Sequence, residues 1–273
     1  MSTKGRAIHR YALGAALMLA GPILRADSVK DLLPQAQQGD VKAQFALAEC
    51  YAKGTGVDKN NTEAIRWMRK AAEQGHAEAQ AQLGMCYHHG EGVEKDMAEA
   101  LKWYVKSADQ GCATAQNNLG VCYREGLGVP KDAVKAAAFY EKAAKQGHAA
   151  AQNNLGICYA TGEGVALDTT KAFGWYKKAA AQGIAQAQHN VGVDYYKGRG
   201  TERDLTEAVA WFRKAAAQGY ADAQFNLAGC YNNGEGVPMD KDEAIRQMRK
   251  AADLGHARAR EIMRQYDAWK ASQ

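Results

Sequence analysis

The sequence AQNNLGVCYREGLGVPKD (residues 115–132) recurs 36 residues later as AQNNLGICYATGEGVALD (residues 151–168). The same period holds along most of the chain, and no insertion or deletion interrupts it. Six full copies run from about Gly39 to Gly255, and a partial copy follows them. Such self-similarity is typical of a solenoid, in which each unit packs mainly on its neighbours.

Four residue types mark the equivalent positions of successive copies. They are glycine at Gly39, Gly75, Gly111, Gly147, Gly183, Gly219 and Gly255; alanine at Ala43, Ala79, Ala115, Ala151, Ala187, Ala223 and Ala259; tyrosine at Tyr51, Tyr87, Tyr123, Tyr159, Tyr195 and Tyr231; and lysine at Lys70, Lys106, Lys142, Lys178, Lys214 and Lys250.

Each copy has the spacing of two helices. In residues 113–125, small or apolar side chains fall at i, i+4, i+5 and i+8, which is one face of a helix. The following Gly126-Leu127-Gly128-Val129 predicts a left-handed C-cap and a turn. Residues 133–146 again have helical spacing, and Gly147 ends that segment. Because two such helices cannot bury a core alone, stacking on the next copy must do so.

The fold class predicted from these patterns is all-α. We expect an α/α superhelical solenoid of about six 36-residue helix-turn-helix repeats, or about twelve antiparallel helices, with a right-handed superhelical twist. Capping helices should flank the repeats. SVKDLLPQAQQ (residues 28–38) should form a partial second-type helix at one end, and residues 261–269 should close the other.

The repeat resembles the Sel-one-like repeat (SLR) family, a relative of the tetratricopeptide repeats. The resemblance covers residues 39–265 and includes the A-Q-x-x-L-G-x-x-Y helix, the G-x-G-V turn and the W-Y-x-K-A-A-x-Q-G helix. It implies a binding scaffold for proteins or peptides and not a catalyst.

Some positions depart from the repeat pattern. Thr201 stands where the other copies have valine, and Gln247 stands at the position of Trp67, Trp103, Phe139, Trp175 and Trp211. Arg264 replaces the glycine expected at a close helix contact. We interpret Gln247 and Arg264 as changes in a terminal repeat, which has no following neighbour to cover its apolar face.

The N-terminal segment differs from the repeats. Lys4, Arg6 and Arg10 precede the apolar run YALGAALMLAGPIL (residues 11–24), and LRA precedes Asp27. This pattern predicts a signal peptide at residues 1–26, cleaved after Ala26, and a repeat domain at residues 27–273 in the periplasm or secreted. An uncleaved anchor and an amphipathic helix are the alternatives. No cysteine follows the run, so a lipoprotein is not expected.

The net charge falls when the signal segment is set aside. The whole chain carries 35 basic and 30 acidic residues, a net charge of +5. Residues 1–26 contain four basic residues and no acid, so the remainder has 31 minus 30, or +1. A nearly neutral surface gives no reason to expect nucleic acid or an anionic membrane as a partner. We expect a monomer that contacts membrane only through an uncleaved signal segment.

Five of the six cysteines occupy one equivalent position, namely Cys50, Cys86, Cys122, Cys158 and Cys230, where the fifth copy has Asp194. Equivalent positions of stacked helices lie roughly 10 Å apart, whereas a disulfide needs Cα atoms within about 7 Å. We therefore expect free, buried thiols despite export. Cysteine-rich secreted members of the family pair two cysteines within each repeat, but this chain lacks the second set.

No catalytic or metal-binding pattern occurs in the sequence. GEGV at Gly90, Gly162 and Gly234 follows a helix and lacks the Lys-Ser/Thr end of a phosphate-binding loop. His76, His148 and His256 are separated by multiples of the repeat period. His88 and His89 are adjacent, and we expect them to point to different helix faces. Neither H-E-x-x-H nor C-x-x-C occurs. We expect no cofactor, no metal and no enzymatic activity.

One alternative function comes from the resemblance. Some secreted relatives are linked to penicillin binding and β-lactam hydrolysis, which would make this chain a cell-wall or β-lactam-interacting protein. A serine β-lactamase requires S-x-x-K. None of Ser28, Ser107 and Ser272 begins that motif, and no G-x-S-x-G occurs. Turnover of nitrocefin would distinguish the two functions.

The candidate binding residues lie on the first helices, which by resemblance to tetratricopeptide grooves line the concave surface. Two sets of equivalent positions vary from copy to copy, and beside them runs a series of asparagines, whose amides both donate and accept hydrogen bonds. The predicted peptide-binding residues are Asn117, Asn118, Val121, Arg124, Asn153, Asn154, Ile157, His189, Asn190, Val193, Tyr196, Phe225 and Asn226. The asparagines could instead serve only the fold, by bonding the neighbouring turn.

Overall fold

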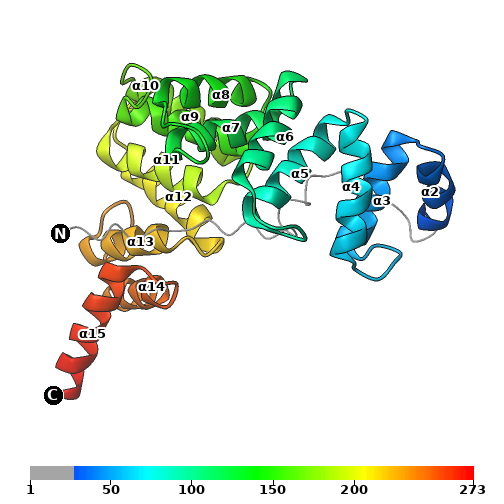
Figure 1. Ribbon diagram of the computed structural model, residues 1–273. Helices are drawn as coiled ribbons and strands as arrows, with labels where there is room; N and C mark the ends of the chain where they lie inside the picture. The colour runs from blue at the N-terminus through cyan, green and yellow to red at the C-terminus, as the bar shows by residue number, and fades with distance from the viewer. Residues whose placement is uncertain (1–27) are drawn as a thin grey trace. The chain divides into compact units, whose positions relative to one another are not determined.

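The computed structural model describes residues 28–273, and the predicted signal segment at residues 1–26 lies outside them. Within the described residues the chain forms fourteen helices and no strand (Figure 1). They are α2 (Ser28–Gln37), α3 (Val41–Lys53), α4 (Asn61–Glu73), α5 (Ala77–His89), α6 (Met97–Asp109), α7 (Ala113–Glu125), α8 (Ala133–Lys145), α9 (Ala149–Thr161), α10 (Thr169–Ala181), α11 (Ala185–Lys197), α12 (Leu205–Ala217), α13 (Ala221–Asn233), α14 (Lys241–Asp253) and α15 (Ala257–Ala271).

The predicted helical solenoid is confirmed. Helices α3 to α14 follow one another as six successive pairs, each with a first helix and a second helix, and α2 and α15 flank them in the chain. The helices belong to two compact units, α2–α7 and α8–α15, which divide between Lys131 and Asp132. Within each unit every helix packs on the next helix along the chain. The handedness of the superhelix stays a prediction.

Helix ends follow from short sequence signals. Asp168 accepts a hydrogen bond from the Lys171 amide at the start of α10, and aspartate or asparagine does the same for the other second helices of the repeats. Each first helix of a repeat ends at a left-handed glycine, such as Gly162 with φ 71°. The next glycine, Gly164, lies so close to α8 that a Cβ added to it would be 2.0 Å from the Ala133 carbonyl oxygen. The G-x-G turn is therefore a packing element.

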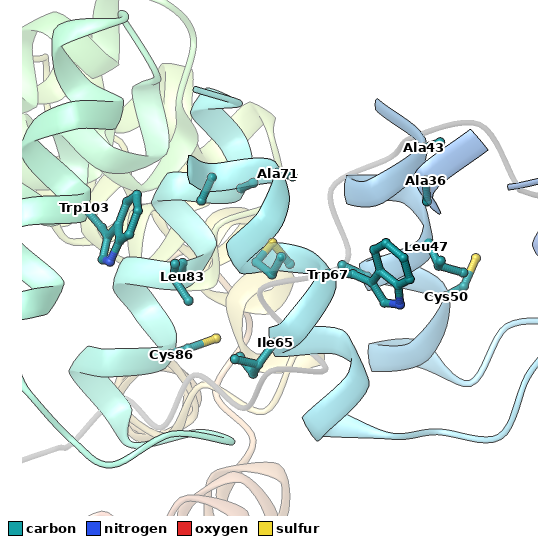
Figure 2. Close-up of a cluster of buried hydrophobic side chains, with 14 of the residues drawn as sticks. Ala36, Ala43, Leu47, Cys50, Ile65, Trp67, Ala71, Leu83, Cys86 and Trp103 are labelled. Carbon is teal, nitrogen blue, oxygen red and sulfur yellow. The ribbon is translucent and has the colours of Figure 1, made fainter. Parts of the chain in front are cut away.

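The core consists of small residues together with large side chains from most of the second helices. Figure 2 shows Trp67 projecting from α4 toward Leu47 and Cys50 of α3. Leu83 and Cys86 of α5 and Trp103 of α6 continue the same buried cluster. This arrangement is what the alanine, leucine and tryptophan positions of the repeat predict.

The flanking helices take the predicted capping roles. Helix α2 is a partial second-type helix, because its Ala36 is buried and its carbonyl accepts from Gln44 Nε2 at 3.0 Å, as Ala72 does from Gln80 one repeat later. Helix α15 contributes Ala259 and Met263 to the last buried cluster. Arg264, at the close-packing position, is exposed and pairs with Glu261 on its own helix.

The six cysteines are free thiols in the structure, five of them buried. Burial raises the pKa of Cys86 and of Cys122 to about 12, so both sulfurs stay protonated at neutral pH. A protonated thiol is neither a good nucleophile nor a good metal ligand.

Candidate partner-binding surface of the first helices

We term the thirteen predicted binding residues the first-helix surface and describe each unit by itself. Four of them lie on α7 in one unit, and nine lie on α9, α11 and α13 in the other. Two of them are buried: Asn117 is 8% exposed and Asn153 is 3% exposed. They cannot form the accessible floor that the repeat spacing suggests. The other eleven are half-buried: Asn118, Val121, Arg124, Asn154, Ile157, His189, Asn190, Val193, Tyr196, Phe225 and Asn226.

In the second unit, asparagine side chains connect one first helix to the next. Asn153 Nδ2 of α9 donates to Gln186 Oε1 of α11 at 3.1 Å. Asn190 Nδ2 of α11 donates to Asn153 Oδ1 at 3.2 Å. Both polar atoms of the buried Asn153 amide thus bond to side chains of α11. The bond to Asn190 also holds that half-buried side chain in place.

His189 links α11 to α13. Asn226 Nδ2 donates to His189 Nε2 at 2.9 Å, which requires an unprotonated nitrogen there. The imidazole lies beside the rings of Phe212 and Tyr220, at centroid distances of 5.8 and 5.2 Å. Burial lowers the pKa of His189, and the nearby Asp222 carboxylate opposes that effect. The His189 imidazole is therefore neutral at pH 7, and its contacts with Asn226, Phe212 and Tyr220 hold it in place.

The remaining residues of the second unit combine an apolar layer with polar edges. Ile157 and Val193 pack partly on the buried clusters below them. Tyr196 donates its hydroxyl proton to Glu235 Oε2 at 2.8 Å. Phe225 stacks on His256 with ring centroids 4.3 Å apart, so it supports the turn before α15.

In the first unit, the predicted residues lie on one helix. Asn117 Nδ2 donates to Asn118 Oδ1 at 3.4 Å, and Arg124 Nε donates to Glu125 Oε1 at 3.0 Å. Val121 is half-buried on the same helix. Asn117 and Asn153, which occupy one of the two variable positions, are therefore structural, whereas Asn118 and Asn154 of the asparagine series are half-buried. Binding of a partner by that series stays a prediction.

Sequence reasoning missed a second polar series. It consists of the glutamines that directly follow the repeated alanines of the first helices. Their side chains are buried, and each Nε2 donates to a carbonyl of the preceding second helix; the six are Gln44, Gln80, Gln116, Gln152, Gln188 and Gln224. A second glutamine, 30 residues later, donates to the side-chain oxygen, as Gln182 does to Gln152 at 2.8 Å. The A-Q pair of all six repeats and the Q-G pair of the first five were the available signal.

No group of three or more histidine, cysteine, aspartate or glutamate residues is arranged to hold a metal ion in residues 28–273. Over the same residues, no helix is both long and apolar enough to cross a membrane.

A family model for the Sel1 repeat matches residues 41–76, 77–112, 113–148, 149–184, 185–220 and 221–256. The chain belongs to the Sel1 repeat family. The sequence resemblance to Sel-one-like repeats is thereby confirmed. No curated protein matched the chain.

Solved Sel1 repeat structures agree with this fold. A Sel1 repeat protein from Oxalobacter formigenes is 32% identical, with a TM-score of 0.72, and the match covers 83% of this chain and 96% of that protein. A protective antigen present in uropathogenic Escherichia coli strains is 38% identical, with a TM-score of 0.75. The match covers 85% of this chain but 50% of the antigen, so this chain spans half the length of that protein. The immunity protein PA5088 from Pseudomonas aeruginosa is 23% identical, with a TM-score of 0.50 and coverage of 88% and 89%, and shares the fold.

Proposed function

We propose that this Sel1 repeat protein is a non-catalytic scaffold that binds a peptide or protein partner on its first-helix surface. Sel1 repeat proteins are generally protein-interaction scaffolds. The observation that carries the proposal is the bonded series Gln186–Asn153–Asn190, with His189–Asn226 beside it. It holds half-exposed amides in fixed orientations over a partly apolar layer, which lowers the entropy lost on binding.

An extended peptide suits this surface chemically. Its backbone presents alternating N–H and C=O groups, and a carboxamide such as that of Asn190 can bond either kind. Ile157 and Val193 supply half-buried apolar contacts between the amides. Such contacts gain affinity mostly from apolar area removed from water.

The test is a quantitative pull-down from envelope extract with the full chain and three variants, Asn154→Ala, Asn190→Ala and Ile157→Glu. Val134→Glu is the matched control, because Val134 is 67% exposed on the second helix α8. The proposal expects the three surface variants to lose the same partners, identified by mass spectrometry, while V134E retains them. Circular dichroism must show that each variant folds.

The outcomes separate binding from support of the fold. If the partners survive all three changes, the first-helix surface is not the binding site. If instead Asn190→Ala lowers the melting temperature by several degrees, the asparagine serves the structure, as loss of a buried hydrogen bond would do.

We also propose that the chain is exported to the periplasm or secreted, because its basic start and apolar run have the composition of a signal peptide. In the native cell the mature chain should begin near Asp27. N-terminal sequencing that finds Met1 or Ser2 on soluble cytoplasmic protein would contradict export.

A further inference from the structure

In five of the six repeats, an aromatic ring of the second helix lies beneath a lysine three residues later. The distances from Nζ to the ring centroid are 4.6 Å for Lys70–Trp67, 4.5 Å for Lys106–Trp103, 5.4 Å for Lys142–Phe139, 4.1 Å for Lys178–Trp175 and 3.8 Å for Lys214–Trp211. These are cation–π contacts over a ring that packs against the small residues of the repeat.

The sixth repeat keeps the lysine but not the ring. Gln247 stands at the ring position beneath Lys250 and donates to Glu243 Oε1 at 2.6 Å. Trp211 bonds to Glu207 in the same way one repeat earlier, at 3.1 Å. The Gln247 amide makes the hydrogen bond that the indole makes in the preceding repeat, but it is too small to fill the volume of an indole.

A hollow of about 200 Å³ occupies this place between α12, α13 and α14. Its walls correspond to those that hold Trp103, since Ala216 and Leu227 are the equivalents of Ala72 and Leu83 in the buried cluster of that tryptophan. Its lining residues are Arg213, Ala216, Ala217, Gln224, Leu227, Gln247 and Lys250.

A second departure from the repeat pattern, at Leu254, leaves a hydrogen-bond acceptor without a donor among the residues that line the hollow. Gln218 donates to Gln188 Oε1 at 2.8 Å, but the next glutamine of that series is replaced by Leu254. As a result Gln224 Oε1 is buried and, among the described residues, has no hydrogen-bond partner. A buried acceptor without a donor favours a ligand that brings one.

We infer that this hollow is a binding site for a tryptophan side chain of a protein partner. An indole offers a flat apolar ring for Ala216 and Leu227, the most favourable π face for Lys250, and one N–H donor for Gln224 Oε1. Arg213 and Lys250 place two positive charges at the hollow, so the partner should carry acidic residues beside its tryptophan. None of the lining residues belongs to the first-helix surface. The binding site inferred here and the proposed function are therefore tested on different residues.

The experiment titrates the isotope-labelled full chain with N-acetyltryptophanamide, its 1-methylindole analogue and N-acetylleucinamide, followed by two-dimensional NMR. Saturable shifts should centre on Gln224, Gln247 and Lys250 with the tryptophan probe. The methylated analogue, which lacks the indole N–H, should bind about fivefold more weakly. The leucine probe should give no saturable shift.

Two variants locate the site. Gln247→Trp supplies the missing ring from the chain itself, so it should abolish binding of the probe and raise the melting temperature. Val105→Trp adds a tryptophan at a 45% exposed position on α6 and should change neither. Leu254→Gln gives Gln224 an internal donor and should weaken the tryptophan probe to the level of its methylated analogue.

Three results would overturn the inference. Unchanged probe binding in Q247W would place the probe elsewhere, and equal affinity for the leucine probe would show a nonspecific apolar contact. Concentration-dependent self-association that is lost in both Q247W and Trp269→Ala would show that the hollow receives the exposed Trp269 of a second copy and not a partner protein.

Discussion

The residue in the middle of each first helix is matched in size to the residue that faces it from the second helix. A Cβ added to Gly156 would lie 2.6 Å from the Tyr176 ring, and one added to Gly192 would lie 2.6 Å from Phe212. The first and last repeats have alanine in place of this glycine and methionine in place of the ring, as Ala48/Met68 and Ala228/Met248. A flexible methionine leaves room for the methyl group that a rigid ring excludes.

Gly156→Ala should therefore lower the free energy of unfolding by about 1–3 kcal/mol, because the new methyl group overpacks against Tyr176. Combining it with Tyr176→Met should recover part of that loss, and urea denaturation of the four proteins gives the coupling energy. Gly174→Ala is the control, since nothing lies within 4 Å of its added Cβ in α10. It should stabilise the chain by about 0.5–1 kcal/mol. Equal effects of G156A and G174A would refute the size-matching argument.

Asp194 is a buried carboxylate at the position that cysteine occupies in the other repeats. It is 4% exposed, and Arg199 Nη2 lies 2.9 Å from its Oδ1. Burial raises the pKa of Asp194 to about 6, although Arg199 opposes the shift. Because the folded-state pKa exceeds the unfolded value of 3.8, stability due to this group is lost as the pH rises through 6.

Asp194→Cys should consequently stabilise the chain at pH 7.5 by about 2 kcal/mol, and the gain should be smaller at pH 4.5. Melting temperatures at the two pH values measure this difference. Arg199→Gln should destabilise the parent at pH 7.5 but not the D194C background. A gain that is the same at both pH values would show that packing, and not ionisation, sets the effect.

At the scale of the helix, three first helices are capped at their start by a histidine side chain. His76, His148 and His256 accept the first-turn amide at Nδ1, with distances of 3.3, 3.2 and 3.1 Å. Asp40 performs the same role for α3 at 2.7 Å. Burial lowers the pKa of His148 below its ordinary value of 6.5. Its contribution to stability is complete above pH 6.5 and is lost as the pH falls below that value.

His148→Asp should keep the cap and remove this pH dependence, because a carboxylate accepts the amide without a proton to lose between pH 8 and pH 5. We expect the variant to match the parent within experimental error at pH 8 and to exceed it by about 1 kcal/mol at pH 5. Guanidinium denaturation at both pH values tests this. A parent that loses no more stability than H148D on acidification would argue against a histidine cap on α9.

At the scale of the whole molecule, each helix within a compact unit contacts the next helix along the chain, so the repeats of a unit are stabilised mainly by their nearest neighbours. Removal of residues 149–184 joins two equivalent positions and leaves every remaining helix with a neighbour of the same type. The shortened chain should fold, and its denaturant m-value should fall by roughly a sixth, in proportion to the surface buried. Far-UV circular dichroism and urea denaturation test this. Loss of cooperative unfolding would contradict nearest-neighbour stabilisation.

The sequence by itself determined the fold class, the succession of helix pairs, the glycines that end the helices and the two flanking helices. It could do so because the same pattern of apolar residues and glycine turns occurs six times. These are local signals that can be read without the three-dimensional structure. The position and number of the helices in residues 28–273 follow from the same period.

Only the tertiary structure decided which polar residues are accessible. Asn117 and Asn118 are neighbours in sequence and similar in spacing, yet burial by the adjacent helices makes the first structural. The glutamine series and the hollow beside Gln247 also became visible only in three dimensions. In both cases the contacts come from different helices: Gln218 lies 30 residues after Gln188, and the hollow lies between α12, α13 and α14. No local sequence pattern records whether such a contact is made or the space is filled.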